Sequence, residues 1–337
     1  MGVRMKDIAR DLGVSVVTVS KVIRNHEDIG SETRERVLKR MKELNYQPNL
    51  AARALVTGKS HMVGLIVPDL LHPFFAQVAK GLSKVFRQNN YTLFIASSED
   101  DSTLEKEQIN QVLARRMDAL LVASTQWSAE SFRLVEEHKT PYVLLDRQFR
   151  GLNANFVGTD DRLAGEVATR HLMDVGCRRI AHIGAREIST PVDRLEGYRQ
   201  ALAERGMTSP PEYVALRSRG DYRGDVAGYD AMKELLRLDA RPDGVFCYND
   251  TTAMGAMKAI LDANLRIPED IAVVGCGNVF YADFLRVSLT TVDQSSQAIG
   301  EHGAALALNL MNARTTPQPR TILVEPKLVV RQSSNRS

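Results

Sequence analysis

Residues 5–23 read MKDIARDLGVSVVTVSKVI, and this stretch decides how the beginning of the chain folds. Apolar residues recur at helical spacing on both sides of a short link, which predicts two helices joined by a tight turn. Gly13 can adopt the positive φ that such a turn needs, and Ser15 can cap the second helix. The spacing of Ala9, Gly13 and Val19 is that of a helix-turn-helix, although many αα-hairpins place small residues similarly.

The positive charge of the chain is concentrated at this end. Residues 1–60 carry 12 Lys and Arg against 7 Asp and Glu, a net charge of +5, whereas the whole chain of 337 residues has a net charge of +3. A third amphipathic helix, expected over residues 31–44, presents a basic polar face. This asymmetry indicates an anionic partner for the first 60 residues; charge alone leaves open a plain solvated basic face.

Residues 45–55 read NYQPNLAARAL and follow the third helix. Together with the helix-turn-helix, this stretch strongly resembles the lactose-repressor (LacI/GalR) family of bacterial transcription regulators, in which the helix-turn-helix is followed by a short hinge helix. The resemblance starts at Met5 and covers nearly the whole chain. It implies that the second helix lies in the major groove of double-stranded DNA, and that the DNA-binding residues are Ser15, Val16, Val17, Thr18, Ser20, Lys21, Arg24, Thr33, Tyr46, Asn49, Ala52, Arg53 and Leu55.

Three of these residues, Val16, Val17 and Lys21, would face base edges. Lys21 can donate hydrogen bonds to guanine N7 and O6, whereas a valine offers only apolar contact, for instance to a thymine methyl group. The alternative for the two valines is a place in the core of the three helices. Contacts with the DNA backbone are expected from Ser15, Thr18, Ser20, Arg24, Thr33 and Tyr46. Such contacts set the register of the protein on the DNA and the salt dependence of its affinity, and they do not select the sequence.

The hinge helix is expected over about residues 48–56. Asn49 is a good N-cap, but the helix is too short to be stable alone, since isolated helices need roughly 12 to 15 residues. By resemblance, two hinge helices of a homodimer pack together over the minor groove, and Leu55 wedges into the central base step of a near-palindromic operator. A linker that only reads as a helix is the alternative.

From residue 61 the pattern changes to short apolar runs that alternate with amphipathic helices. This alternation predicts an α/β fold with parallel sheets, and more than 250 residues of it predict two lobes. Strands or extended segments are expected over residues 62–67, 91–96, 119–123, 142–145, 156–160, 180–183, 245–248, 271–275, 289–294 and 319–325.

The resemblance implies two domains. Residues 1–60 would form the helix-turn-helix head with its hinge helix. Residues 61–337 would form a two-lobed, periplasmic-binding-protein-like core with Rossmann-like parallel sheets, for effector binding and dimerisation. The expected lobes are, for lobe 1, about 61–159 plus 293–318 and, for lobe 2, about 160–292 plus 319–331.

Ligand pockets in open α/β lobes form at the carboxyl ends of strands, so residues just after each strand are candidates. An aromatic pair can stack on a sugar ring or a base, and the fork of an arginine suits paired hydroxyls or a carboxylate. Phe75 could instead belong to the core, and Asn249 or Asp250 could instead cap the following helix. By resemblance, the effector-binding residues are Phe74, Phe75, Asp146, Thr190, Arg194, Tyr222, Asn249, Asp250, Gly277 and Gln294.

Two positions depart from the family pattern. Gly277, in the turn Gly275-Cys276-Gly277-Asn278, stands where the family usually carries an aspartate that binds effector hydroxyls. Ile188 replaces a polar residue seen in the purine-responsive members. The cleft is therefore expected to be larger and less charged than theirs, and we hypothesise a carbohydrate-like effector: a sugar, or a sugar-derived acid or phosphate.

The chain is expected to act in the cytoplasm, because it shows no secretory signal and no run of the roughly 20 apolar residues that spans a bilayer. No cofactor and no membrane partner are expected. No metal site is expected either, because the three cysteines are far apart and form no ligand pattern. A homodimer is expected, because no extra C-terminal heptad helix follows. The apolar stripe within residues 75–82 is a candidate dimer surface, or else part of the core.

These features predict a sequence-specific DNA-binding transcriptional regulator, a repressor in the leading hypothesis, that responds to a small molecule bound between its lobes. Whether the ligand strengthens or weakens DNA binding is left open. A solute-binding protein of a transport system would share the two lobes, but the DNA-binding head argues against it. An enzyme is third, because no catalytic constellation can be assembled and residues 275–280 lack the third glycine of a dinucleotide-binding fingerprint.

Overall fold

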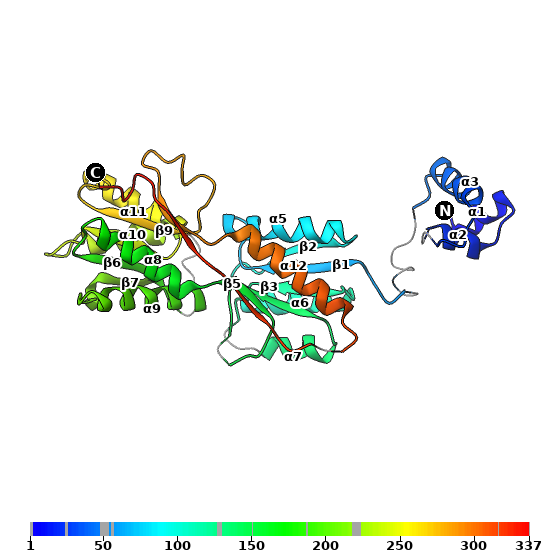
Figure 1. The fold of residues 1–337 in the computed structure, drawn as a ribbon, viewed down its shortest axis with the longest axis horizontal. Helices are drawn as coiled ribbons and strands as arrows, with labels where there is room; N and C mark the ends of the chain where they lie inside the picture. Colours follow the sequence, from blue (N-terminus) through cyan, green and yellow to red (C-terminus); the bar gives the residue numbers. More distant parts are fainter. Residues whose placement is uncertain are drawn as a thin grey trace. The chain divides into compact units, whose positions relative to one another are not determined.

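A computed structural model describes residues 3–23, 26–47, 54, 57–126, 130–149, 151–186, 188–217, 224–315 and 317–336. The chain divides into two compact units, Met1–Ser60 and His61–Ser337, each described here by itself (Figure 1). None of the helices in the described ranges combines the length and the apolar character needed to cross a membrane.

The first unit is a three-helix head with its own small core. Its helices are α1 (Met5–Leu12), α2 (Val16–Ile23) and α3 (Ser31–Glu43). Gly13 ends α1 in the left-handed conformation, with φ 66°. Ser15 caps α2, because its Oγ accepts a hydrogen bond from the Thr18 amide at 3.0 Å. The core consists of Ile8, Ala9, Val19, Val22 and Val37. The predicted turn, cap and helix crossing are therefore confirmed.

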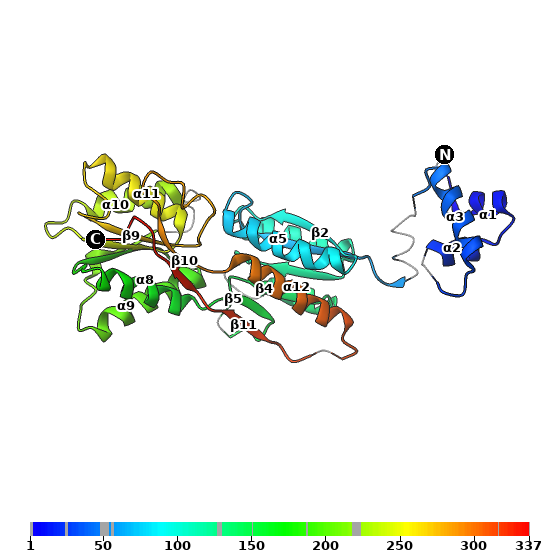
Figure 2. The same ribbon diagram turned by 45° about the horizontal axis from the view of Figure 1, so that its top comes forward.

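The first lobe of the second unit is built on a six-stranded parallel sheet in the order β11-β5-β4-β3-β1-β2. In chain order the strands are β1 (Met62–Val67), β2 (Thr92–Ser97), β3 (Ala119–Val122), β4 (Tyr142–Leu145), β5 (Phe156–Thr159) and β11 (Thr321–Val324). One face is covered by α5 (Pro73–Gln88) and α12 (Ser296–Asn312), and the other by α6 (Ser102–Ala114) and α7 (Glu130–Glu137). Figure 2 shows α5 and α12 side by side.

The second lobe repeats this plan with the sheet order β12-β10-β9-β8-β6-β7, in which β12 alone is antiparallel to its neighbour. Its strands are β6 (Ile180–Ala185), β7 (Val214–Arg217), β8 (Gly244–Cys247), β9 (Ala272–Cys276), β10 (Thr290–Asp293) and β12 (Lys327–Val329). The pairs α8 (Asp161–Asp174) with α9 (Ser189–Glu204), and α10 (Gly224–Leu235) with α11 (Asp250–Asp262), cover its two faces. A short 3₁₀ helix, Pro211–Tyr213, precedes β7.

The expected lobe boundaries are wrong at the C-terminal end. Residues 319–331 were assigned to lobe 2, but β11 pairs with β5 in the first sheet, and only β12 returns to the second. The physical reason is the apolar side of β11, where Ile322 and Val324 pack against the core of the first lobe. The sequence analysis also missed β7, an edge strand whose four residues are all only partly buried.

The apolar stripe on α5 is part of the core. Phe75, Val78 and Leu82 are buried within the first lobe against the sheet and α12, and Phe75 remains only 7% exposed. The stripe is therefore not available as a dimer surface, and the alternative assignment to the core is the right one.

The helices α8 and α9 approach each other so closely that their contact requires glycine. A Cβ atom built on Gly165 would lie 2.1 Å from the carbonyl oxygen of Arg194, and one built on Gly197 would lie 2.0 Å from the carbonyl oxygen of Arg162. Both distances are far below van der Waals contact. Only glycine at these two positions allows the close approach of α9 to α8, and this approach sets the position of Arg194 relative to α8.

We expect Gly197→Ala to destabilise the protein although alanine is the better helix former by about 1 kcal/mol. The added methyl group must push α9 away from α8, and overpacking of this kind costs about 1–3 kcal/mol. The measurement is the thermal unfolding midpoint followed by circular dichroism. Ala203→Ser, on the exposed side of the same helix, is the control and should stay within about 0.5 kcal/mol of the parent. An unchanged midpoint in Gly197→Ala would contradict the close crossing.

Candidate functional site

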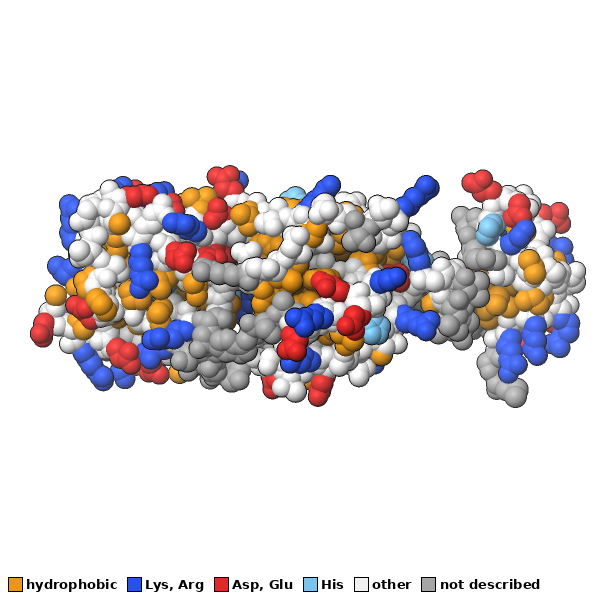
Figure 3. Space-filling view, turned by 90° about the horizontal axis from the view of Figure 1, so that it is seen from below, with side chains coloured by type: hydrophobic (Ala, Val, Ile, Leu, Met, Phe, Trp, Pro, Cys, Tyr) orange, Lys and Arg blue, Asp and Glu red, His pale blue; other side chains and the backbone are white. Residues whose placement is uncertain are grey.

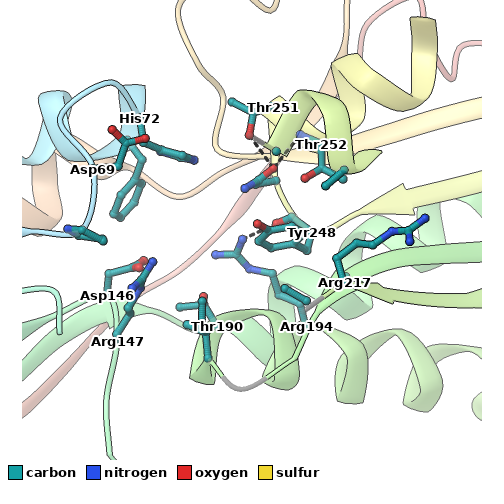
Figure 4. A pocket seen from close by; sticks show the side chains of 18 of the residues that line it. Asp69, His72, Asp146, Arg147, Thr190, Arg194, Arg217, Tyr248, Thr251 and Thr252 are labelled. Atoms are coloured by element: carbon teal, nitrogen blue, oxygen red, sulfur yellow. Dashed lines mark hydrogen bonds between the residues drawn. The ribbon is translucent and has the colours of Figure 1, made fainter. Parts of the chain in front are cut away.

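A cavity of about 130 Å³ lies between the two lobes of the second unit. It sits at the carboxyl ends of strands from both sheets, where ligand sites of open α/β folds form. Figure 4 shows side chains that converge on it from both lobes. Of the ten predicted effector-binding residues, seven line this cavity: Phe74, Phe75, Asp146, Thr190, Arg194, Asn249 and Gln294.

The three remaining predicted residues do not join them. Tyr222 lies outside the described residues. Asp250 and Gly277 are not among the lining residues. The Asp250 carboxylate is turned to the inside of the second lobe, where it accepts hydrogen bonds from Thr291 Oγ1 at 2.5 Å and from the Val279 amide at 2.9 Å. Its role in this structure is to tie α11 to the segments around β9 and β10.

Asn249 both lines the cavity and caps α11. Its Oδ1 accepts hydrogen bonds from the Thr252 amide at 2.8 Å and from Thr251 Oγ1 at 2.9 Å. The capping alternative is thus confirmed for Asn249. Thr251 and Thr252 reach the cavity from the first turn of α11 (Figure 4).

Arg194 is the central charged group of the cavity. It is 3% exposed and makes a two-point contact with Asp161 Oδ1, from Nε at 2.8 Å and from Nη2 at 2.6 Å. Its Nη1 donates to the carbonyl oxygen of Tyr248. Burial by itself lowers the pKa of Arg194, but the carboxylates of Asp161 and Asp146 outweigh it, and the net shift is upward. The guanidinium is therefore held as a cation at the floor of the cleft.

The pKa values of the two carboxyl groups beside Arg194 are raised as well, because burial outweighs the attraction of the arginine. Burial raises the pKa of Asp161 to about 7, against the attraction of Arg194. Burial also raises the pKa of Asp146, against Arg194 and Arg147. Asp146 ends β4 in the left-handed conformation, with φ 61°, a cost that a non-glycine residue bears mainly at functional positions.

The wall from the first lobe combines aromatic rings with charge. Phe74 and Phe75 lie edge to face, with ring centroids 5.1 Å apart and planes at 85°. Arg147 Nη1 donates to Asp100 Oδ1 at 3.0 Å, and its guanidinium lies 6.0 Å from the Phe75 ring. Burial, together with Arg147 and Arg194, lowers the pKa of His72 to about 4, so this imidazole is neutral near pH 7.

Several lining residues were missed by the sequence analysis. Most of them follow the ends of β1, β2, β6 and β8, so the rule that selected the predicted residues would have found them if applied at each of these strands; Arg217 is the last residue of β7, which the sequence did not predict. They are Asp69, His72, Asp100, Arg186, Arg217, Tyr248, Thr251 and Thr252.

Two hydrogen bonds join the lobes beside the cavity. Gln294 Nε2 donates to Thr159 Oγ1 at 3.3 Å, which links two of the segments that cross between the lobes. The Gln148 amide, from the first lobe, donates to Ser189 Oγ of the second at 3.1 Å. The separation of the walls is thus held by direct contacts as well as by the crossing segments.

The head presents a second candidate site on α2. Val16 and Val17 are 44% and 61% exposed, so the alternative that placed them in the core is wrong. Lys21 lies on the same helix and forms an ion pair with Asp28. Basic side chains gather on the face of the head seen in Figure 3. Apolar and cationic groups are therefore displayed together on α2, as a reader of base edges requires.

The other predicted DNA-binding residues fall into two groups. Ser15 is exposed, while Thr18, Ser20, Thr33 and Tyr46 are partly exposed, and burial raises the pKa of Tyr46. Arg24, Asn49, Ala52, Arg53 and Leu55, and with them nearly all of the expected hinge helix, lie outside the described residues. Within the described ranges, no cluster of three or more His, Cys, Asp or Glu side chains could hold a metal ion.

We expect the stability of the protein to carry a pH dependence from Asp250. Burial raises the pKa of Asp250 from 3.8 to about 6, so the folded protein binds this proton more tightly than the unfolded chain does. The contribution is fully present below about pH 4 and is lost as the pH rises through about 6. Asp250→Asn removes the titration, so the parent should lose stability relative to the variant between about pH 4 and pH 7. Guanidinium unfolding of both proteins at the two pH values measures this; a constant difference would contradict it.

Comparison with known proteins identifies the family type of both units. Residues 4–49 match the family model "Bacterial regulatory proteins, lacI family", and residues 169–334 match a periplasmic binding protein-like domain. The ribose operon repressor of Haemophilus influenzae is 33% identical over 332 residues, covering 98% of each chain. The transcriptional repressor PurR of H. influenzae strain PittEE is 32% identical over 339 residues, covering 98% of each.

A solved structure extends the similarity to three dimensions. The complex of the transcriptional regulator CelR with cellobiose has a TM-score of 0.75 and 28% identity, and the match covers 98% of this chain and 99% of that one. The predicted fold, a helix-turn-helix head and a periplasmic-binding-protein-like α/β core, is confirmed. This chain belongs to the lacI family of bacterial regulatory proteins, a family of DNA-binding transcriptional regulators.

Proposed function

We propose that this protein is a cytoplasmic, homodimeric repressor that binds a near-palindromic operator. A small carbohydrate-like molecule that binds between the lobes either strengthens or weakens the binding of the protein to this operator. The observation that carries the proposal is the presence, in one chain, of exposed apolar and cationic side chains on the second helix of a helix-turn-helix and of a cavity with a buried arginine. Val17 and Lys21 supply the first, and Arg194 supplies the second.

The cavity suits a polyhydroxylated ring. The rings of Phe74 and Phe75 provide an apolar surface for it, the N–H groups of Arg194 and Asn249 Nδ2 provide donors, and the Asp146 carboxyl group provides an acceptor for its hydroxyl groups. The relative CelR was solved with cellobiose, and another relative is a ribose operon repressor. These names support a carbohydrate-like effector here.

Control of DNA binding would follow from linkage between the two sites. The cavity walls come from different lobes, so a bound molecule changes the free energy of one lobe arrangement relative to another. The effector alters operator affinity only to the extent that its own affinity differs between the two arrangements. An inducer and a corepressor need the same wall chemistry and differ in the arrangement they favour.

We expect Lys21→Ala to weaken operator binding by about 5- to 150-fold, the cost of about 1–3 kcal/mol for one base contact. An operator selected from a random duplex library by the full-length protein serves as the probe, and fluorescence anisotropy gives the dissociation constant. Lys39→Ala, at an exposed position of α3, is the matched control with less than a twofold effect. Equal losses by Lys21→Ala on the operator and on an unrelated duplex would instead assign Lys21 to the phosphate backbone.

We expect a ligand response in operator binding that depends on Arg194. Full-length protein on its selected operator is titrated with sugars, sugar phosphates and purines, and any compound that changes the affinity is tested on Arg194→Gln and on Thr190→Val, which keeps the side-chain volume. Both variants should lose the response, whereas Arg199→Gln, at an exposed position of the same helix, should keep it. A response retained in both cavity variants would place the effector elsewhere.

A further inference from the structure

The two walls of the cavity carry opposite charge. The first lobe contributes three carboxylates, Asp69, Asp100 and Asp146, against one cation, Arg147. The second lobe contributes three arginines, Arg186, Arg194 and Arg217, and none of its described lining residues is acidic. A ligand in this cavity therefore meets an acidic wall on one side and a basic wall on the other.

Some of these charges already have partners. Arg147 is paired with Asp100 at 3.0 Å, and Arg217 Nη2 lies 3.1 Å from Glu234 Oε2, outside the cavity. Figure 4 shows the Arg217 side chain directed away from the centre of the cavity. Arg194 is also paired, with Asp161 at 2.6 Å, and reaches a ligand only through N–H groups that this pair leaves unused. Among the described lining residues, the charges without an ion pair are Asp69 and Asp146 on the acidic wall and Arg186 on the basic wall.

Arg194 retains donors for a ligand. A guanidinium has five N–H groups, and three of them are used by Asp161 and the Tyr248 carbonyl oxygen. The remaining two are on Nη1 and Nη2. Figure 4 shows the Arg194 guanidinium directed toward the space between the walls. Arg186 is exposed at the rim of the same wall.

A buried hydroxyl, that of Thr252, lies on the basic wall. Thr252 is 1% exposed and lines the cavity beside the Tyr248 side chain, and its Oγ1 makes no hydrogen bond of ordinary geometry with the described residues. It lies in the first turn of α11, where the helix dipole favours an anion, although the Thr252 amide itself is already capped by Asn249 Oδ1. Asp250, in the same turn, is directed away toward Thr291 and Val279. An anionic group could accept a hydrogen bond from the Thr252 hydroxyl at low desolvation cost, because that hydroxyl is already out of water.

Gly277, which lies outside the lining of the cavity, adds no carboxylate to the basic wall. Position 277 is glycine, with φ 138°, and the nearest carboxylate oxygen is that of Asp250, which is already hydrogen-bonded. No aspartate is therefore available at this position to accept hydrogen bonds from effector hydroxyls.

The cavity volume limits the size of the ligand. Pockets that enclose drug-sized ligands measure about 300–1,000 Å³, and this one measures about 130 Å³. In this arrangement of the lobes the cavity therefore favours a ligand smaller than drug size.

We propose that the effector is an anionic monosaccharide derivative, whose carboxylate or phosphate group binds Arg194, Thr252 and Arg186 while its hydroxyl groups face Asp146. This inference rests on the proposed function and narrows the class of its effector. The orientation follows from charge, since the anionic group is attracted by the second-lobe wall and repelled by the carboxylates of the first.

The test is calorimetric titration of the full-length protein with matched pairs of compounds. Gluconate, glucuronate and glucose 6-phosphate are each compared with glucose, and ribose 5-phosphate with ribose. We expect at least one anionic member to bind about tenfold or more tightly than its neutral parent, the factor that one charge-assisted hydrogen bond supplies. Binding by the acids identifies a carboxylate effector, and binding by the esters identifies a phosphate effector.

Two variants separate the proposed anion site from a non-specific charge effect. Thr252→Val should weaken binding of the anionic compound by about tenfold, and Arg186→Gln should weaken it by about two- to fivefold, since Arg186 is exposed and screened. Arg237→Gln, at an exposed position of the second lobe outside the cavity, is the matched control and should leave the affinity unchanged.

The outcomes distinguish this inference from the proposed function. Tighter binding of a neutral sugar than of its acid or ester, no binding by any anionic member, or no effect of both cavity variants would overturn the anion site. In the first case, a neutral sugar that also changes operator affinity would leave the proposed function standing. Tight binding of an anionic member without any change in operator affinity would support the anion site and overturn the proposed control of DNA binding.

Discussion

The buried ion pair between Arg194 and Asp161 is the interaction on which the second unit depends. Two charges removed from water are tolerated only if each finds a partner with good geometry, and loss of one partner costs about 3–5 kcal/mol because the other is left buried and uncompensated. Here the geometry is set by the glycines Gly165 and Gly197, which let α8 and α9 approach until Asp161 and Arg194 meet at 2.6 Å. The packing of α8 against α9 therefore also determines where the charged group of Arg194 lies in the cavity.

This pair also lies where the chain enters the second lobe. Asp161 is the first residue of α8, directly after the segment that leaves β5 of the first sheet. A second crossing segment, after β10, is linked to the first by the bond from Gln294 to Thr159. A rotation of one lobe relative to the other therefore involves the segment that ends at Asp161, and Asp161 is the ion-pair partner of Arg194. Domain closure about a few segment-terminal residues is a common way in which ligand binding is converted into a change of shape.

The sequence predicted those parts of the fold that local pattern determines. β1 and β4 were predicted with their observed bounds, because each is a buried apolar run that ends at a polar or turn residue. β7 was missed, because an edge strand with partly exposed residues has no such run. The segment of β11 was recognised as extended but assigned to the wrong lobe, since alternation shows which side of a strand is apolar and not which sheet it joins.

The same limit applies to the site. The rule that ligand-binding residues follow the ends of strands correctly placed Asn249 at the cavity. The same rule also selected Asp250, whose side chain points into the second lobe instead. Direction of a side chain depends on the helix that starts there and on its partners across the sheet, Thr291 and the Val279 amide. The sequence therefore indicates the edge of the sheet at which ligand chemistry lies, while the neighbours on other strands decide which residues face it.

Opposite charge on the two walls has a consequence for control. A molecule that interacts with one wall alone has the same affinity in the open and closed arrangements, and it shifts no equilibrium however tightly it binds. A molecule with an anionic group at one end and hydroxyl donors at the other satisfies Arg194 and Asp146 together only when the walls are close. Each charge-assisted hydrogen bond gained on closure adds about 1.5–3 kcal/mol of preference for the closed arrangement. Two such bonds approach the roughly 5.5 kcal/mol that reverses a population from 1:99 to 99:1, so under the proposed mechanism a small bipolar ligand would supply enough free energy to change the arrangement of the lobes.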